Sequence, residues 1–205
     1  MTSTATARHA CPRCGEEFAA DALFCPTDGT PLQPAHDPYI GVRVGGDIEL
    51  TAVIGSGAMG QVYRAHQRSI GRDVAVKVLR RELSSNHNLV ARFQREAKLA
   101  SRIRHAHVVE VYLAGQLPDG ALYIVMEYLD GVSLGAALKA AGGSLPAPRA
   151  LRIALQICDA VGEAHRHGVV HRDLKPDNVM LVPRGDTADW VKVLDFGIAK
   201  GEHGD

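Results

Sequence analysis

The 205-residue sequence has no excess of either charge and no long apolar run. Lys plus Arg number 23, as do Asp plus Glu, so the formal net charge at pH 7 is zero. A balanced chain has no field that favours nucleic acid or an anionic membrane, and we expect neither as a partner. No apolar stretch could cross a bilayer, and residues 1–10 lack the apolar core of a signal peptide. We therefore expect a cytoplasmic protein with no membrane segment in this chain.

Cysteine is scarce, with four residues in the chain. Disulfides are rare in a reducing compartment, so none is expected. Cys158 stands alone in a helical stretch, and we expect it to be a small buried hydrophobe. Apolar residues make up 46% of the chain. This fraction and the length of 205 residues allow one sizeable domain and a small one.

The other three cysteines lie in residues 9–30, which resemble a short zinc ribbon. The first half reads Cys11-Pro12-Arg13-Cys14-Gly15, and the second reads Cys25-Pro26-Thr27-Asp28-Gly29. Asp28 stands where a fourth cysteine is expected, and zinc accepts a carboxylate oxygen. The predicted Zn²⁺ ligands are Cys11, Cys14, Cys25 and Asp28, with His9 or His36 as substitutes. The alternative is a degenerate ribbon with free thiols and no metal.

Residues 31–46 are punctuated by proline and lack apolar periodicity, which is typical of a linker. Strands are predicted at 48–54, 61–65, 73–79, 108–114 and 122–128, and a helix at 88–104. This gives an antiparallel five-stranded lobe with one helix over residues 47–128. The rest of the domain, 129–205, becomes helical. Its longest helix is predicted at 146–167, with an apolar stripe of Leu151, Ala154, Leu155, Cys158, Val161 and Ala164, and short strands at 179–182 and 191–194.

A glycine-rich sequence joins the first two predicted strands of this lobe. Gly55, Ser56, Gly57 and Gly60 would let the backbone approach phosphate groups closely. A dinucleotide-binding fold needs a helix after such a loop. Residues 61–65 instead have a strand pattern, which argues against that fold and leaves either a phosphate loop or a plain hairpin turn.

The next strand contains a lysine in an apolar setting, Val74-Ala75-Val76-Lys77. Alternation places Ala75 and Lys77 on the same face. A lysine that points into a cleft needs an anionic partner. Glu96, between Phe93 and Ala97 on the inward face of the predicted helix, is the partner that we expect.

The most specific stretch is His171-Arg172-Asp173-Leu174-Lys175-Pro176-Asp177-Asn178, followed by Asp195-Phe196-Gly197. It supplies carboxylates, an amide and an ammonium group that could converge on a metal-bound triphosphate. With the glycine loop, Lys77 and Glu96 in this order, the chain resembles the protein kinases. A lysine two residues after Asp173, here Lys175, resembles the pattern of the serine/threonine branch. The sequence as a whole resembles bacterial kinases of the eukaryotic type.

The resemblance implies an α+β, bilobal fold with ATP and Mg²⁺ between the lobes, preceded by the zinc-ribbon-like module. By resemblance, Lys77 holds the α- and β-phosphates and pairs with Glu96, and Lys175 touches the γ-phosphate. Asp173 orients the substrate hydroxyl and accepts its proton, while Asn178 and Asp195 bind Mg²⁺. His171 packs against Phe196 rather than acting as a base.

The resemblance also implies an adenine site. Met126 takes the gatekeeper position, and the backbone from Glu127 to Leu129 forms the hinge. The ring would lie between Val62, Ala75 and Met180, with Gly55, Ser56, Gly57 and Gly60 over the phosphates.

The family continues beyond Asp-Phe-Gly with an activation segment and further helices, so we expect a C-terminally truncated domain with an exposed apolar patch. The predicted function is transfer of the ATP γ-phosphate to serine or threonine hydroxyls of proteins. The alternatives are a module that binds ATP without transfer, or an adaptor that works through the zinc ribbon.

Overall fold

The computed structural model describes residues 8–11, 13–19, 21–34, 37–57, 59–81 and 87–196, with only the backbone at residues 8, 33, 34, 87–89, 92 and 96. The chain divides into a small unit that ends at Val42 and a large unit that begins at Arg43. None of the helices described in these ranges is long and apolar enough to cross a membrane.

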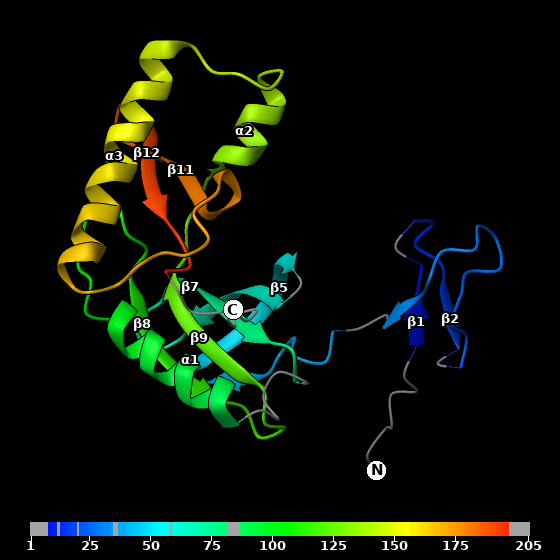
Figure 1. Ribbon diagram of the computed structural model, residues 1–205. Helices are drawn as coiled ribbons and strands as arrows, with labels where there is room; N and C mark the ends of the chain where they lie inside the picture. Colours follow the sequence, from blue (N-terminus) through cyan, green and yellow to red (C-terminus); the bar gives the residue numbers. More distant parts are fainter. Residues whose placement is uncertain are drawn as a thin grey trace. The chain divides into compact units, whose positions relative to one another are not determined.

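The small unit contains an antiparallel sheet of three short strands in the order β2-β1-β3 (Figure 1). They are β1 (Arg8–Ala10), β2 (Glu17–Ala19) and β3 (Gln33–Pro34). Its described part has hardly any apolar core, because only Cys11 and Cys25 are buried, while Leu23 and Phe24 are 69% and 62% exposed.

The first lobe of the large unit is built on an antiparallel sheet in the order β4-β5-β6-β7-β9-β8. The five predicted strands are present, as β5 (Ile48–Gly57), β6 (Gly60–Gln67), β7 (Arg72–Leu79), β8 (Val111–Gln116) and β9 (Leu122–Glu127). A sixth, β4 (Arg43–Val44), pairs with the start of β5.

Two details near the predicted boundaries were not expected. Residues 33–34 and 43–44, inside the linker predicted at 31–46, form short strands, because backbone pairing needs no apolar pattern. The strand predicted from residue 108 begins at Val111, because Val108 bridges to Val193 of the second lobe instead.

The helix of this lobe, α1 (His87–Ala100), packs its buried Phe93, Ala97 and Ala100 into the same cluster as Val111, Leu122 and Ile124 of the sheet. It ends four residues before the predicted 104, although Ile103 stays buried beyond it. The apolar spacing therefore predicted the buried face, while the turns that follow the helix extended the same pattern.

The second lobe consists of two helices and a small sheet, α2 (Leu134–Ala140), α3 (Ala147–Arg166), β10 (Val132–Ser133), β11 (Val179–Arg184) and β12 (Thr187–Val193). The strand order is β10-β11-β12, and Figure 1 shows α3 running beside this sheet. Ser133 caps α2 by accepting a hydrogen bond from Ala136 N at 3.0 Å.

The buried face of α3 matches only the C-terminal end of the predicted stripe, where Ala164 is buried and Val161 is partly buried. Ile153, Ala160 and Ala164 are buried against the sheet, whereas Leu151 and Leu155 are 62% and 58% exposed. Cys158 is exposed as well, so the prediction that it is buried was wrong. The helix carries apolar residues on two faces, and the sheet covers only one of them.

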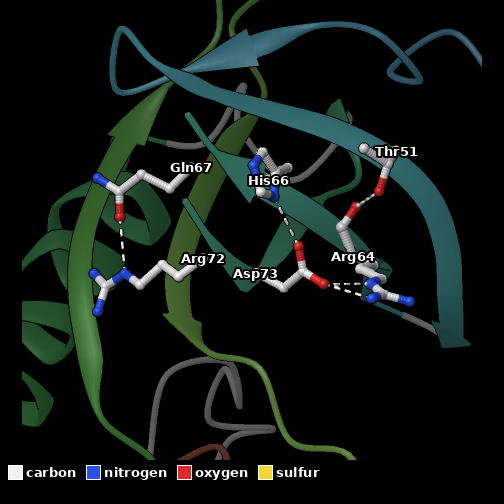
Figure 2. A network of polar contacts seen from close by, with 6 residues as sticks. All are labelled: Thr51, Arg64, His66, Gln67, Arg72 and Asp73. Carbon is white, nitrogen blue, oxygen red and sulfur yellow. Dashed lines mark hydrogen bonds and ion pairs between the residues drawn. The ribbon is translucent and has the colours of Figure 1, made fainter. Parts of the chain in front are cut away.

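Polar side chains join β5, β6 and β7 on an exposed face of the first lobe (Figure 2). Asp73 accepts hydrogen bonds from Arg64 Nε at 2.9 Å and pairs with His66 Nδ1 at 3.0 Å, and these contacts hold the pKa of Asp73 below its usual range. Thr51 donates to Arg64 O at 2.9 Å. His66 and Asp73 are direct cross-strand partners, so the network fixes the β6–β7 register.

Candidate functional site

The glycine loop is the tip of the hairpin formed by β5 and β6, where Gly57 and Gly60 face each other. Gly60 has φ +155°, and a Cβ there would lie 2.0 Å from Val78 O of β7. At Gly57, a Cβ would meet no atom within 4 Å. Gly60 is therefore required by close packing on β7, and Gly57 leaves the backbone open to a ligand.

Lys77 lies on β7 between Val62 of β6 and Ile124 of β9. Its side chain is 14% exposed, and Nζ lies 2.7 Å from Asp195 Oδ2. Glu96, the predicted partner, lies on α1, but its side chain is outside the described residues. The described contact therefore joins the lysine of the first lobe directly to the carboxylate that is expected to bind metal.

His171 and Phe196 anchor the loop that carries Asp173. His171 is 3% exposed, its Nε2 lies 2.6 Å from Leu194 O, and its ring centroid lies 4.8 Å from that of Phe196. The predicted packing of His171 against Phe196 is confirmed. These contacts give His171 a structural role, as the sequence predicted, rather than the role of a base.

Asp173, Lys175 and Asn178 converge within one turn of chain. Lys175 Nζ lies 3.1 Å from Asp173 Oδ2. Asn178, at the end of the 3-10 turn Pro176–Asn178, donates from Nδ2 to Asp173 O at 2.8 Å, and its own backbone O accepts from Leu194 N at 2.9 Å. These bonds place the segment that contains Asp173 beside the one that leads to Asp195.

Backbone strain is concentrated at this junction. In the described part of the chain, Arg172 (φ 61°) and Asp195 (φ 55°) are the non-glycine residues with positive φ. Such conformations cost about 1–3 kcal/mol and persist where surrounding contacts impose them. Arg172 directly precedes Asp173, and Asp195 is itself one of the predicted site residues, so the strain coincides with the candidate site.

The donor set fits Mg²⁺. Asp195 offers a carboxylate and Asn178 an amide, and the described contacts of that amide use its nitrogen, so a cation would meet its oxygen. Mg²⁺ prefers hard oxygen ligands of this kind and keeps several waters or phosphate oxygens.

Four of the five predicted adenine-site residues lie in the first lobe or at its end. Ala75 and Met126 are cross-strand partners and 6% and 8% exposed, and Val62 and Leu129 pack against the same cluster. Met180, partly buried, lies on β11 of the second lobe. The structure therefore brings Val62, Ala75, Met126 and Leu129 together, and Met180 comes from the other lobe.

The second predicted cluster, in the small unit, is also brought together. The ligand atoms of Cys11, Cys14, Cys25 and Asp28 lie within 4.8 Å of one another. The two halves have the same turn, in which Gly15 N donates to Cys11 O at 2.8 Å and Gly29 N to Cys25 O at 2.9 Å. Both glycines have positive φ, 77° and 70°, which explains their place in the sequence.

Hydrogen bonds, burial and neighbouring thiols shift the pKa values of Cys11 and Cys14 in this cluster. Although burial raises it, hydrogen bonds from Cys14 N and Arg13 N lower the pKa of Cys11. For Cys14, a backbone hydrogen bond at Glu16 lowers the pKa, but burial and the other thiols raise it to about 11. Several thiolates cannot coexist here without a positive ion. His9 bonds Ala22 O at 2.9 Å instead of joining the cluster, and His36 lies outside the described residues.

Comparisons with known proteins agree with this geometry. The sequence profile described as "Protein kinase domain" matches residues 48–205. The chain is 48% identical over 167 residues to serine/threonine-protein kinase pkn3 of Myxococcus xanthus, covering 82% of this chain and 30% of that protein. It is 43% identical over 204 residues to serine/threonine-protein kinase Pkn1 of the same organism, covering 93% and 29%.

Solved structures give the same result. The kinase domain of Mycobacterium tuberculosis PknI matches with a TM-score of 0.69 at 33% identity, covering 78% of this chain and 63% of that one. The chain therefore belongs to the protein kinase family, in its bacterial serine/threonine branch. It spans less than a third of the length of the two Myxococcus relatives.

One site contact was missed from the sequence. Lys192 of β12 reaches Glu127 at the end of β9, 65 residues away, with Nζ 2.7 Å from Oε2. The only local sign is that Lys192 interrupts the apolar pair Val191 and Val193, both fully buried. A lysine on an otherwise buried strand indicates a partner but does not name it.

Proposed function

We propose that the large unit transfers the γ-phosphate of ATP to serine or threonine hydroxyls of protein substrates. The observation that carries this proposal is the convergence of Lys77, Asp173, Asn178 and Asp195 from both lobes. Phosphoryl transfer depends mainly on positioning and on neutralising charge, and these groups supply both.

Each residue has a specific task. Lys77, with Glu96 as its partner in the nucleotide-bound state, orients the α- and β-phosphates. Asp173 holds the substrate hydroxyl and accepts its proton, and Lys175, 3.1 Å away, places positive charge at the γ-phosphate. Asn178 and Asp195 hold Mg²⁺, which neutralises phosphate charge when bound.

The adenine ring is proposed to lie between Val62, Ala75 and Met180. The backbone from Glu127 to Leu129 would bind its edge, with Met126 behind it. Gly55, Ser56, Gly57 and Gly60 cover the phosphates. The support is the packing of Val62, Ala75, Met126 and Leu129 around one cluster.

The test is phosphate transfer from radiolabelled ATP to a generic protein substrate, compared between the wild type and Asp173→Asn. We expect labelling that the substitution abolishes. Equal signals would exclude transfer by this chain. ATP–Mg²⁺ that raises the melting temperature without any labelling would instead support the alternative, a module that binds ATP without transfer.

We also propose that the small unit binds one structural Zn²⁺ through Cys11, Cys14, Cys25 and Asp28. The support is the cluster itself and the near absence of another core in the described part of this unit. A segment with so little buried surface needs a metal or a cross-link to fold. This metal-folded unit is the candidate adaptor.

Metal analysis of the purified chain tests the zinc proposal. We expect about one zinc per chain in the wild type, a marked loss in Asp28→Ala and Cys25→Ser, and retention in Asp28→Cys. His9→Ala is the matched control, because His9 comes two residues before Cys11 in the chain but its ring bonds Ala22 O. Zinc-free wild type, or loss in His9→Ala alone, would contradict the ligand set.

The domain limits are proposed as 9–30 for the zinc module and 47–205 for the kinase domain. A cytoplasmic location is proposed because ATP and reduced thiols occur there, and none of the four cysteines forms a disulfide. Protein substrates, not nucleic acid, are the proposed partners, since the charge is balanced.

A further inference from the structure

Lys192 connects the two lobes behind the candidate nucleotide site. Its side chain is 13% exposed, and Nζ donates to Glu127 Oε2 at 2.7 Å and to Val108 O at 3.2 Å. The three residues belong to β12, to the end of β9 and to the segment before β8. One ammonium group therefore holds together three parts of the chain that are distant in sequence.

The surroundings make this a defined polar junction. Lys192 and Glu127 line a small pocket with Ile103, Arg104, His105, Val108 and Glu110. Glu110 N donates to Glu127 Oε2 at 3.4 Å, and Glu110 O accepts from Glu127 N at 2.9 Å. The carboxylate of Glu127 is thus held by the lysine on one side and by a backbone amide on the other.

Backbone bonds fix the same segment to β12. Val193 N donates to His107 O at 2.8 Å, and Val109 N donates to Val193 O at 3.0 Å. These bonds set the position of β12 beside residues 107–109, but they do not reach β9. Lys192 is the described side chain of β12 that extends the junction to Glu127.

The two ends of this junction are the two ends of the proposed ATP site. Glu127 begins the hinge, where the adenine is expected, and Lys192 lies three residues before Asp195, where the metal is expected. We propose that Lys192 is a positioning residue for ATP, which holds the hinge and Asp195 at the separation that the nucleotide requires. This inference rests on the proposed function of the large unit.

The expected effect depends on the fraction of molecules in which the hinge and Asp195 are both placed to bind ATP. A ligand that contacts both ends binds only when both are in place, so its apparent dissociation constant rises as the competent fraction falls. Removing Lys192 leaves the partly buried carboxylate of Glu127 without its cation, which favours a displaced hinge. We expect Lys192→Met to weaken ATP–Mg²⁺ binding about fivefold.

The control is a second ion pair of β12, which does not reach the hinge. Arg149 of α3 donates to Asp189 from Nε at 2.8 Å and from Nη2 at 2.7 Å, within the second lobe. Asp189→Asn breaks this pair, so it tests the stability of the same strand without the hinge contact. Lys192→Arg retains a cation that can reach Glu127.

The experiment is calorimetric titration of the 205-residue chain with ATP–Mg²⁺, together with the melting temperature of each variant. Weaker binding in Lys192→Met, with near wild-type affinity in Lys192→Arg and Asp189→Asn, supports the proposal. In a double-mutant cycle with Glu127→Gln, the two effects should not add, because one contact is lost in both.

Wild-type affinity in Lys192→Met overturns the positioning role while leaving the ATP site intact. Equal weakening in Asp189→Asn also overturns it, because the effect would then follow stability alone. If Lys192→Met does not fold, Lys192→Gln, which keeps a donor near Val108 O, provides the same comparison. No ATP binding by the wild type overturns the proposed function and this inference with it.

Discussion

Gly60→Ala tests how closely the glycine hairpin packs on β7. The added Cβ would lie 2.0 Å from Val78 O, 2.9 Å from Leu79 Cα and 3.0 Å from Val78 C. All three are backbone atoms of a paired strand, since Gly60 faces Leu79 in the ladder. They cannot rotate away as a side chain would, so relief requires the end of the β6–β7 pairing to open.

The magnitude follows from two costs. Alanine at φ +155° is strained by about 1–3 kcal/mol, and overpacking against a fixed backbone typically costs 1–3 kcal/mol. Partial fraying of the strand end relieves some of both, so we expect a loss of about 2–4 kcal/mol in the free energy of unfolding. For a unit of this size, that lowers the melting temperature by roughly 6–12 °C.

Gly57→Ala is the matched control on the facing position of the same hairpin. Its Cβ meets no atom within 4 Å and φ is not in the left-handed region, so stability should change by less than about 0.5 kcal/mol. Its ATP affinity should nevertheless fall, because the methyl group occupies the space left for phosphate. Melting curves and ATP titrations of both variants separate the two roles. A Gly60→Ala chain that melts within about 1 °C of the wild type would refute the steric argument.

Two further predictions concern the second lobe. Ile153→Ala, at a position 2% exposed, should lower the free energy of unfolding by about 2–4 kcal/mol, whereas Leu155→Ala on the exposed face should change it by less than about 0.5 kcal/mol; urea titrations compare them. The hydrogen bonds from Arg149 hold the pKa of Asp189 in the folded protein below its usual range. The ion pair therefore stabilises the fold at pH values above the unfolded pKa of about 3.9. This contribution is lost as the pH falls through the lower pKa of the folded state. The stability difference between the wild type and Asp189→Asn should therefore be largest above about pH 5 and disappear in stronger acid; a difference that grows on acidification would contradict the assignment.

The candidate site residues could be placed in the fold from the sequence because each follows a strong local pattern. Alternation put Ala75 and Lys77 on the same face of a predicted strand, and both lie on β7. The stretch from His171 to Asn178 was expected to bring polar groups together, and Asn178 donates to Asp173 O there. The repeated Cys-Pro-x-x-Gly turns likewise predicted that Asp28 would lie beside the cysteines.

Features that depend on tertiary contacts could not be placed in this way. The first half of the stripe predicted on α3 was wrong because Leu151 and Leu155 are as apolar as Ile153, and only the position of β12 decides which face is covered. Strand β4 is two residues long, too short for any periodicity. Lys192 and Glu127 lie on β12 and β9, in different lobes, and they meet only when the lobes pack together. No local sequence pattern contains that information.

The pairing of Lys77 with Asp195 shows how the site can hold opposite charges without a ligand. Each is partly buried, and an isolated charge at such a position is costly, so the two neutralise each other across the lobes. A metal-bound triphosphate offers a negative charge to the lysine and a positive one to the carboxylate. Exchanging one partner for another keeps each group neutralised, and both are already partly removed from water, at 14% and 31% exposure. Lys77→Met would remove this balance in both states: Asp195 would lose its cation in the chain alone, and the phosphates would lose theirs in the complex. We therefore propose that the ion pair preorganises the candidate nucleotide site and keeps its two charged groups neutralised before the nucleotide binds.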